Sequence, residues 1–160
     1  MSTTHNKGKT GRGLLLIAAT LSFIAAFLHI AVIIGGGDWY RVFGAGEHMA
    51  QLAESGSLYP VGVTLLIASV LFVWGLYALS GAGVIGRLPW LKQGLIAITA
   101  VYLLRAIAGF TLPFVSLHPS VIQNSLTFWL VSSLVCLVYG LCYLFGSLKH
   151  WQHLGRVDPL

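Results

Sequence analysis

Four apolar segments, each close to 20 residues long, constrain this chain more than any other feature. At 1.5 Å per residue, a helix of this length crosses the roughly 30 Å hydrocarbon core of a bilayer. Backbone amides in lipid need hydrogen bonds within their own segment, so we predict α-helices rather than strands. The predicted fold is all-α, a bundle of four transmembrane helices in one membrane domain, residues 14–146. The predicted spans are about 14–34, 60–79, 94–112 and 126–146.

The composition agrees with a membrane protein. The chain has 57% hydrophobic and 8% charged residues and a mean hydropathy of +0.86. Soluble domains carry about 25% charged residues. The first apolar segment follows basic residues, as a signal-peptide core does, but it is longer than the usual ~7–15 residues and no Ala-x-Ala site follows it. We therefore predict a retained helix.

Lys and Arg are distributed unevenly between the two sides of the predicted bundle. With the N-terminus in the cytoplasm, the inner side holds nearly all of them, the outer side holds Arg41, and Arg105 lies within a span. The positive-inside rule therefore predicts that both tails, residues 1–13 and 147–160, are cytoplasmic. Topology then accounts for the net charge of +5, so nucleic acid is not an expected partner.

The first span carries small residues at a regular spacing. Ala18, Ser22 and Ala26 recur every four residues, which places them on one face of the helix. Small residues at this spacing let two membrane helices approach closely. We predict that this face packs against another helix of the bundle.

The connection between the first two spans concentrates the polar chemistry of the chain. Gly35–Gly37 is expected to end the first helix, and Asp38 is expected to cap a new one. The prediction for residues 38–55 is a short amphipathic segment on the outer surface. Its aromatic side chains are expected at the level of the lipid headgroups; they are Trp39, Tyr40 and Phe43.

Three polar residues of this segment share a helix face. Glu47, Gln51 and Glu54 follow one another at i, i+4 and i+7. Two interpretations remain open for the segment. It is either an interfacial anchor whose acids are solvated, or a lid that folds over a polar pocket in the bundle.

Arg105 is the strongest argument for a pocket. It lies seven residues before Leu112 in the predicted third span, about 10 Å deep, and an arginine in the membrane cannot become neutral by losing its proton. No predicted span contains Asp or Glu. We predict that the outer segment folds inward and pairs Arg105 with Glu47 or Asp38. The alternative is that Arg105 extends to lipid phosphates.

His29 lies in the first span, about 8 Å from its predicted outer end. It shares a face with Ser22 and points at a neighbouring helix, with Tyr102 as a candidate hydrogen-bond partner. One interpretation is a structural hydrogen bond. The other is a cavity in the outer leaflet lined by His29, Tyr102 and Arg105, suited to an anionic or carbonyl-bearing amphiphile such as a quinone, a lipid or a fatty acid. The complete set of candidate binding residues is His29, Asp38, Trp39, Tyr40, Arg41, Glu47, His48, Tyr102 and Arg105.

Familiar catalytic and metal-binding patterns do not occur in the sequence. Cys136 and Cys142 are six residues apart, too far for a disulfide within a helix. His150 and His153 supply two metal ligands, which make a poor site alone. We find no phosphate-binding loop, zinc-protease motif or nucleophile elbow. No catalytic residue, metal or resident cofactor is therefore predicted, and an enzyme is the less favoured class.

Several features resemble small four-helix bacterial membrane proteins of the DoxX-like type and related domains of unknown function. They are His29 followed by Gly35–Gly37, the Arg105-Ala106 pair, and the polar residues Gln123 and Asn124 before the fourth span. The resemblance covers the four-span layout and includes no catalytic motif. It implies a bacterial inner membrane and assigns no activity.

Three classes of function are compatible with the sequence. The first is a binding or accessory protein with the polar pocket described above, acting alone, as a homo-oligomer or as a subunit of a larger membrane complex. The second is an enzyme that acts on a quinone or a lipid. The third is an interaction protein, such as one that confers immunity to a pore-forming toxin, which needs no polar pocket.

Overall fold

The structure of the chain, a computed structural model, describes residues 2–152 and 154, without the side chains of residues 2–7 and 120. Every element in this part of the chain is a helix, and four helices are long and apolar enough to cross a membrane, as the sequence predicts. Two short helices lie in the connections. In chain order the helices are α1 (Ser2–Val42), α2 (Glu47–Glu54), α3 (Tyr59–Gly81), α4 (Leu91–Val115), α5 (Pro119–Ile122) and α6 (Leu126–His150).

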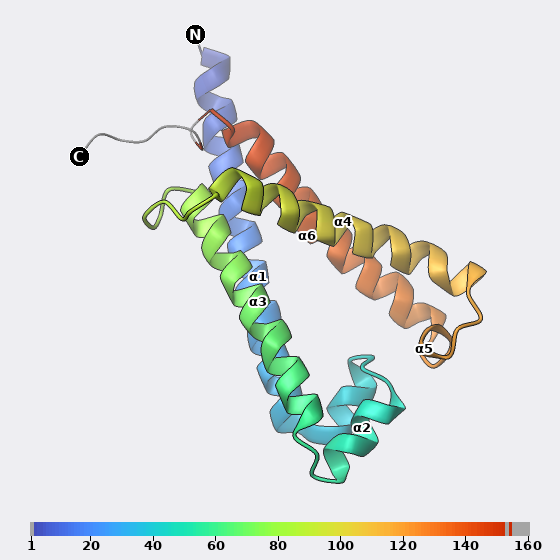
Figure 1. The fold of residues 1–160 in the computed structure, drawn as a ribbon. Coiled ribbons are helices and arrows are strands. Elements are labelled where there is room, and N and C mark those ends of the chain that lie inside the picture. Colours follow the sequence, from blue (N-terminus) through green and yellow to red (C-terminus); the bar gives the residue numbers. More distant parts are fainter. Residues whose placement is uncertain (1, 153, 155–160) are drawn as a thin grey trace.

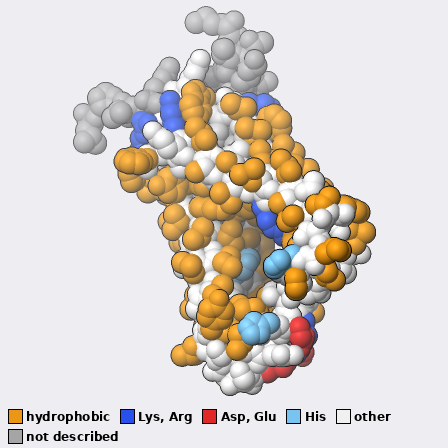
Figure 2. Space-filling view, turned by 45° about the vertical axis from the view of Figure 1, so that its right-hand side comes forward, with side chains coloured by type: hydrophobic (Ala, Val, Ile, Leu, Met, Phe, Trp, Pro, Cys, Tyr) orange, Lys and Arg blue, Asp and Glu red, His pale blue; other side chains and the backbone are white. Residues whose placement is uncertain are grey.

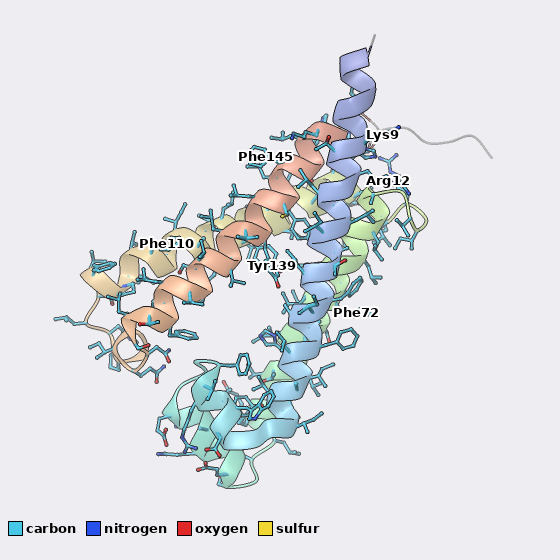
Figure 3. All side chains as sticks on the ribbon, turned by 180° about the vertical axis from the view of Figure 1, so that it is seen from behind. Lys9, Arg12, Phe72, Phe110, Tyr139 and Phe145 are labelled. Carbon is cyan, nitrogen blue, oxygen red and sulfur yellow. The ribbon has the colours of Figure 1, made fainter. Side chains whose placement is uncertain are left out.

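The long helices form two arms arranged as a V (Figure 1). One arm consists of α1 and α3, and the other consists of α4 and α6; within each arm the two helices pack along each other. The arms meet at the end where the chain begins and diverge toward the end that carries α2 and α5. We call these ends the closed end and the wide end. Lys9 and Arg12 lie at the closed end (Figure 3).

Small residues allow the close approach of α1 and α6 at the closed end. A Cβ atom on Gly11 would collide with the backbone of His150, and one on Gly146 would press on Leu15. Ala18, Ser22 and Ala26 are all buried, which confirms the predicted packing face of the first span. This seam ends near Ser22, beyond which the arms separate.

Tyrosine hydroxyls connect the arms where they begin to separate. Tyr143 of α6 donates to the carbonyl of Trp74 (2.9 Å) and shares a hydrogen bond with Ser22 (2.9 Å). Tyr139, one turn further along α6, donates to the carbonyl of Leu21 (2.9 Å). Figure 3 shows Tyr139 between α6 and α1 at this level. These side chains close the narrow part of the V.

The helices extend beyond the predicted spans. Helix α4 continues from the predicted end at 112 to Val115, so Arg105 lies ten residues from its end, about 15 Å rather than 10 Å. Helix α1 continues to Val42, although Gly36 has non-helical dihedral angles (φ 67°, ψ −153°). Gly36 therefore kinks the chain where the end of the first helix was predicted. Residues 38–55 form two helical pieces separated by a turn, rather than one amphipathic helix.

Candidate functional site

A hollow separates the two arms between the closed end and the wide end. Figure 2 shows it as an indentation of the molecular surface, with histidine side chains and a basic side chain along its walls. We call this space the cleft. The helices that form its walls are long and apolar enough to cross a membrane.

The helical repeat places Arg105 on the wall that α4 presents to α3. Gly94 lies on the stripe of α4 that faces α3, because a Cβ atom there would strike the ring of Tyr77. Arg105 is eleven residues further on, which is close to three turns, so it continues the same stripe. At its level α3 has diverged from α4 (Figure 1). Arg105 therefore faces the cleft.

The guanidinium of Arg105 rests against α6. Its Cζ atom lies 5.0 Å from the centre of the Trp129 ring, and Nη2 donates to the hydroxyl of Ser132 across 3.5 Å. Ser132 in turn donates to the carbonyl of Trp129 (3.2 Å). These contacts orient the cation through an aromatic face and a weak neutral acceptor. They do not neutralise its charge.

Two polar atoms near this contact are buried and have no hydrogen-bond partner among the described residues: Arg105 Nη1 and the hydroxyl oxygen of Ser133. Both lie where a side chain on Gly109 would begin, so the glycine provides the space that they occupy. A charged donor without an acceptor is costly in an apolar environment, roughly 2.5–3.5 kcal/mol for arginine at a membrane centre on insertion scales. The site thus holds a cation that lacks a counter-ion in the described chain.

The predicted pairing of Arg105 with Glu47 or Asp38 is wrong. Both carboxylates bind Arg41, which lies on the same connecting segment at the wide end. The acids pair with Arg41 because it is nearer. Asp38 precedes Arg41 by three residues, and the turn between α1 and α2 brings Glu47 back to Arg41, whereas Arg105 lies about 15 Å inside its span. The connecting segment therefore neutralises itself and does not reach down to the buried arginine.

Arg41 is the centre of a compact ion cluster. Its Nε and Nη2 bind the two oxygens of Glu47 (2.8 and 2.9 Å), and its Nη1 binds Glu54 (2.6 Å) and Asp38 (3.2 Å). Glu54 passes over the backbone at Gly37, where a Cβ atom would block it. Hydrogen bonds from Arg41 lower the pKa of Glu47 and of Glu54 below the ordinary value. The shared face of Glu47, Gln51 and Glu54 is confirmed, since Gln51 also donates to Glu47 (3.1 Å).

His29 faces the cleft from the opposite arm. It lies seven residues, two turns, beyond Ser22, so it continues the stripe of α1 that packs on α6 at the closed end. Its Nδ1 lies 2.7 Å from the carbonyl oxygen of Ala25. A carbonyl only accepts, so Nδ1 carries the hydrogen, and Nε2 is the acceptor of the neutral ring. The structural hydrogen bond is confirmed, but it forms within α1 and not to Tyr102.

Tyr102 belongs to the aromatic core at the narrow end of the cleft. Its ring contacts those of Trp74 (5.0 Å), Tyr139 (5.2 Å) and Tyr143 (5.8 Å). It is 6% exposed, and its hydroxyl has no hydrogen-bond partner among the described residues. Tyr102 therefore forms the floor of the cleft instead of an exposed wall.

The remaining candidates lie near the ion cluster. Trp39 is exposed and stacks on Phe43 (5.7 Å between ring centres). His48 is exposed on α2. Tyr40, predicted at the headgroup level, is instead buried, packs in a small core with Val32 and Ala50, and accepts a hydrogen bond from Thr64 (3.2 Å). Tyr40 thus fixes the connection to α3 and is not available to a ligand.

The sequence interpretation missed the partners of Arg105 on the fourth span. Trp129 and Ser132 are three residues apart, so they share one face of α6, and Ser133 adjoins them. An aromatic residue followed by a serine pair in a span was the available signal. Gly109 was a second signal, because residues four apart share one face of a helix and a glycine there leaves space beside Arg105.

The described residues contain no group of three or more side chains that could hold a metal ion. His150 Nδ1 lies 3.1 Å from the carbonyl of Gly8, and His153 is outside the described residues. Comparisons with protein families, curated proteins and solved structures gave no match to this chain. The function must therefore be inferred from the chemistry of the cleft.

Proposed function

We propose that this protein binds an amphiphile whose anionic or carbonyl-bearing head contacts Arg105 and whose apolar tail lies in the cleft between the arms. The observation that carries the proposal is the position of Arg105: a permanent cation in a membrane-level wall, held by Trp129 and Ser132 and without a carboxylate partner among the described residues. A charged head supplies the missing acceptor. His29 on the facing wall offers a second polar contact.

The apolar surroundings favour an amphiphile over a small water-soluble anion. The arms expose large hydrophobic side chains, and the helices on both sides of the cleft are long and apolar enough to cross a membrane. A lipid-like molecule can enter such a space from the bilayer without crossing water. Fatty acids, anionic lipids and quinones share the required combination of an oxygen-bearing head and an apolar body.

We also propose the location and orientation. The closed end carries Lys9 and Arg12 near the C-terminal end of α6, whereas Arg41 at the wide end is neutralised by acids. The positive-inside rule then favours cytoplasmic tails. The membrane in this proposal is a bacterial inner membrane. A membrane-impermeant maleimide tests this orientation in intact cells after replacement of both native cysteines: it should label His48→Cys and not Trp151→Cys. The reverse pattern would contradict the orientation.

The binding proposal is tested by purification in mild detergent followed by mass spectrometry of what co-purifies. The wild-type protein should retain an anionic or carbonyl-bearing amphiphile, and Arg105→Ala should lose it, with binding weakened roughly ten- to a hundred-fold for one charge-assisted hydrogen-bonding group. Arg12→Gln is the matched control, since it also removes one arginine but lies at the closed end, away from the cleft, and should retain the ligand. Equal retention by all three proteins, at equal accumulation, would refute the pocket and favour the protein-interaction class.

A further inference from the structure

We infer that the turn between α1 and α2, residues 44–46, is a latch that holds the wide ends of the two arms together. The arms are joined at the closed end by a long packed seam, but they have diverged before α2 and α5. The turn crosses this gap. Its role for the ligand rests on the proposed function, whereas its role in holding the arms follows from the contacts alone.

The end of α1 directs the turn toward the other arm. The amide of Ala45 donates to the carbonyl of Tyr40 (2.9 Å) and that of Gly44 to the carbonyl of Arg41 (3.1 Å), the pair of hydrogen bonds of a Schellman cap. Gly44 has φ 76°, as this cap requires, and Gly46 has φ 92°. Glu47 follows directly and is fixed by Arg41, so the turn is anchored on both sides.

The turn then meets the beginning of α6. Asn124 Nδ2 donates to the carbonyl of Gly44 (3.2 Å). The ring of Phe128 occupies the space where a side chain on Gly44 would lie, and Gln123 does the same at Gly46. The two glycines are thus required by their dihedral angles and by the partner surface together. One polar and two packing contacts connect the arms here.

The receiving side of the latch adjoins the Arg105 site. Phe128 precedes Trp129 in the chain, and their rings are in edge contact (6.1 Å). Trp129 also donates its indole N–H to the carbonyl of Val121 (3.0 Å), which ties α6 to α5. A displacement of Phe128 would therefore move the ring over which Arg105 lies. Release of the latch would widen the cleft and disturb the cation at the same time.

The latch predicts a specific difference between two glycine variants. Gly44 and Gly56 both have positive φ, 76° and 78°, so alanine is strained to a similar degree at each. A Cβ atom on Gly44 strikes Phe128, whereas one on Gly56 meets nothing within 4 Å. Gly44→Ala should therefore separate the arms, and Gly56→Ala should not.

The separation is measured by pulsed electron paramagnetic resonance in lipid nanodiscs without added ligand. Spin labels are placed at His48→Cys on α2 and Leu126→Cys on α6, both exposed, in a chain lacking the native cysteines. We expect a single narrow distance distribution for the parent and for Gly56→Ala, and a broader distribution with a longer mean for Gly44→Ala. Phe128→Ala removes the contact without backbone strain and should broaden the distribution as well.

Unchanged distributions in both Gly44→Ala and Phe128→Ala would overturn the latch. A widened distribution supports it whether or not a ligand binds. If Gly44→Ala widens the arms while the wild-type protein retains no amphiphile, the latch stands as a conformational device and the proposed function falls. The two inferences therefore fail independently.

Discussion

Arg41 and Arg105 place the same side chain in two opposite situations. Arg41 lies in the connection at the wide end, and its guanidinium binds three carboxylates. Arg105 lies ten residues inside α4, and its closest partners are a neutral hydroxyl and an aromatic ring. Three of the four acidic residues in the chain bind Arg41, which is close to the end of the spanning helices. None of these three pairs with Arg105, which lies well inside α4. The difference separates a structural cation from one that still needs an acceptor.

The largest expected effect comes from giving Arg105 the counter-ion that Arg41 already has. In Ser132→Asp, a carboxylate replaces the hydroxyl that lies 3.5 Å from Nη2. This internal acid would compete with an anionic head, so we expect affinity for an anionic amphiphile to fall roughly ten-fold or more, the loss of a charge-assisted hydrogen bond. Titration of the purified protein in nanodiscs with a fluorescent fatty acid measures the change.

Ser132→Asn is the matched control for that substitution, because it has nearly the same shape and no charge. It should bind the fatty acid almost as the wild-type protein does. If the Asn and Asp variants lose affinity equally, shape rather than charge governs the position, and the contrast between the two arginines loses its functional meaning.

The second prediction concerns the space that Arg105 occupies. A Cβ atom on Gly109 would overlap the hydroxyl of Ser133 and crowd Arg105 Nη1, so Gly109→Ala must spread α4 from α6 or displace the guanidinium. We expect a loss of about 1–3 kcal/mol in unfolding free energy, as for other overpacked sites. Thermal unfolding in detergent measures it. Gly62→Ala on α3, where a Cβ atom meets nothing within 4 Å, should cost far less, and equal losses would contradict the packing described here.

A smaller, local effect is expected at Arg41. Arg41→Gln leaves Glu47 and Glu54 without their shared cation, so α2 should open more readily from α1. We expect amide hydrogen exchange in α2 to accelerate by roughly ten-fold while the long helices are unaffected, since local openings are independent of global unfolding. Arg105→Gln provides the comparison: it should leave exchange in α2 unchanged. Accelerated exchange in both variants would show that the two cations are coupled.

The smallest effect is a pH dependence confined to the ion cluster. Because Arg41 lowers the pKa of Glu47 and Glu54 in the folded protein, their contribution to stability is present at neutral pH. It is lost as the pH falls below their ordinary value of 4.5 and through the folded pKa values. Hydrogen exchange in α2 of the wild-type protein should therefore accelerate on acidification, after correction for the intrinsic exchange rate. The same pH change should have less effect in Arg41→Gln.

The long helices could be predicted because a bilayer imposes length and apolarity on each span independently. Segment length alone located α3, and Pro60 at its first turn marked its start. The kink at Gly36 followed from three consecutive glycines. Such features are local, so the sequence carries them without knowledge of the partners.

The V shape and the partners of Arg105 could not be predicted in the same way. They depend on which helix faces approach each other, and apolar faces look alike when lipid replaces water outside the bundle. The wrong pairing has this origin: the acids lie in the connecting segment as predicted, but the prediction paired them with Arg105 and not with Arg41, which is only three residues from Asp38. Short sequence separation was the better guide, because one turn of helix brings these charges together.

Photolabelling with a diazirine fatty acid in nanodiscs tests most directly whether the unneutralised arginine recruits a ligand. Peptide mapping should place the saturable label on the segments of α4 and α6 around Arg105 and Trp129. Excess unlabelled fatty acid should remove this label, and Arg105→Ala should lack it. A label spread over exposed apolar positions of the other arm as well, such as Ile17 and Leu66, and equal in the wild-type protein and Arg105→Ala, would contradict the account.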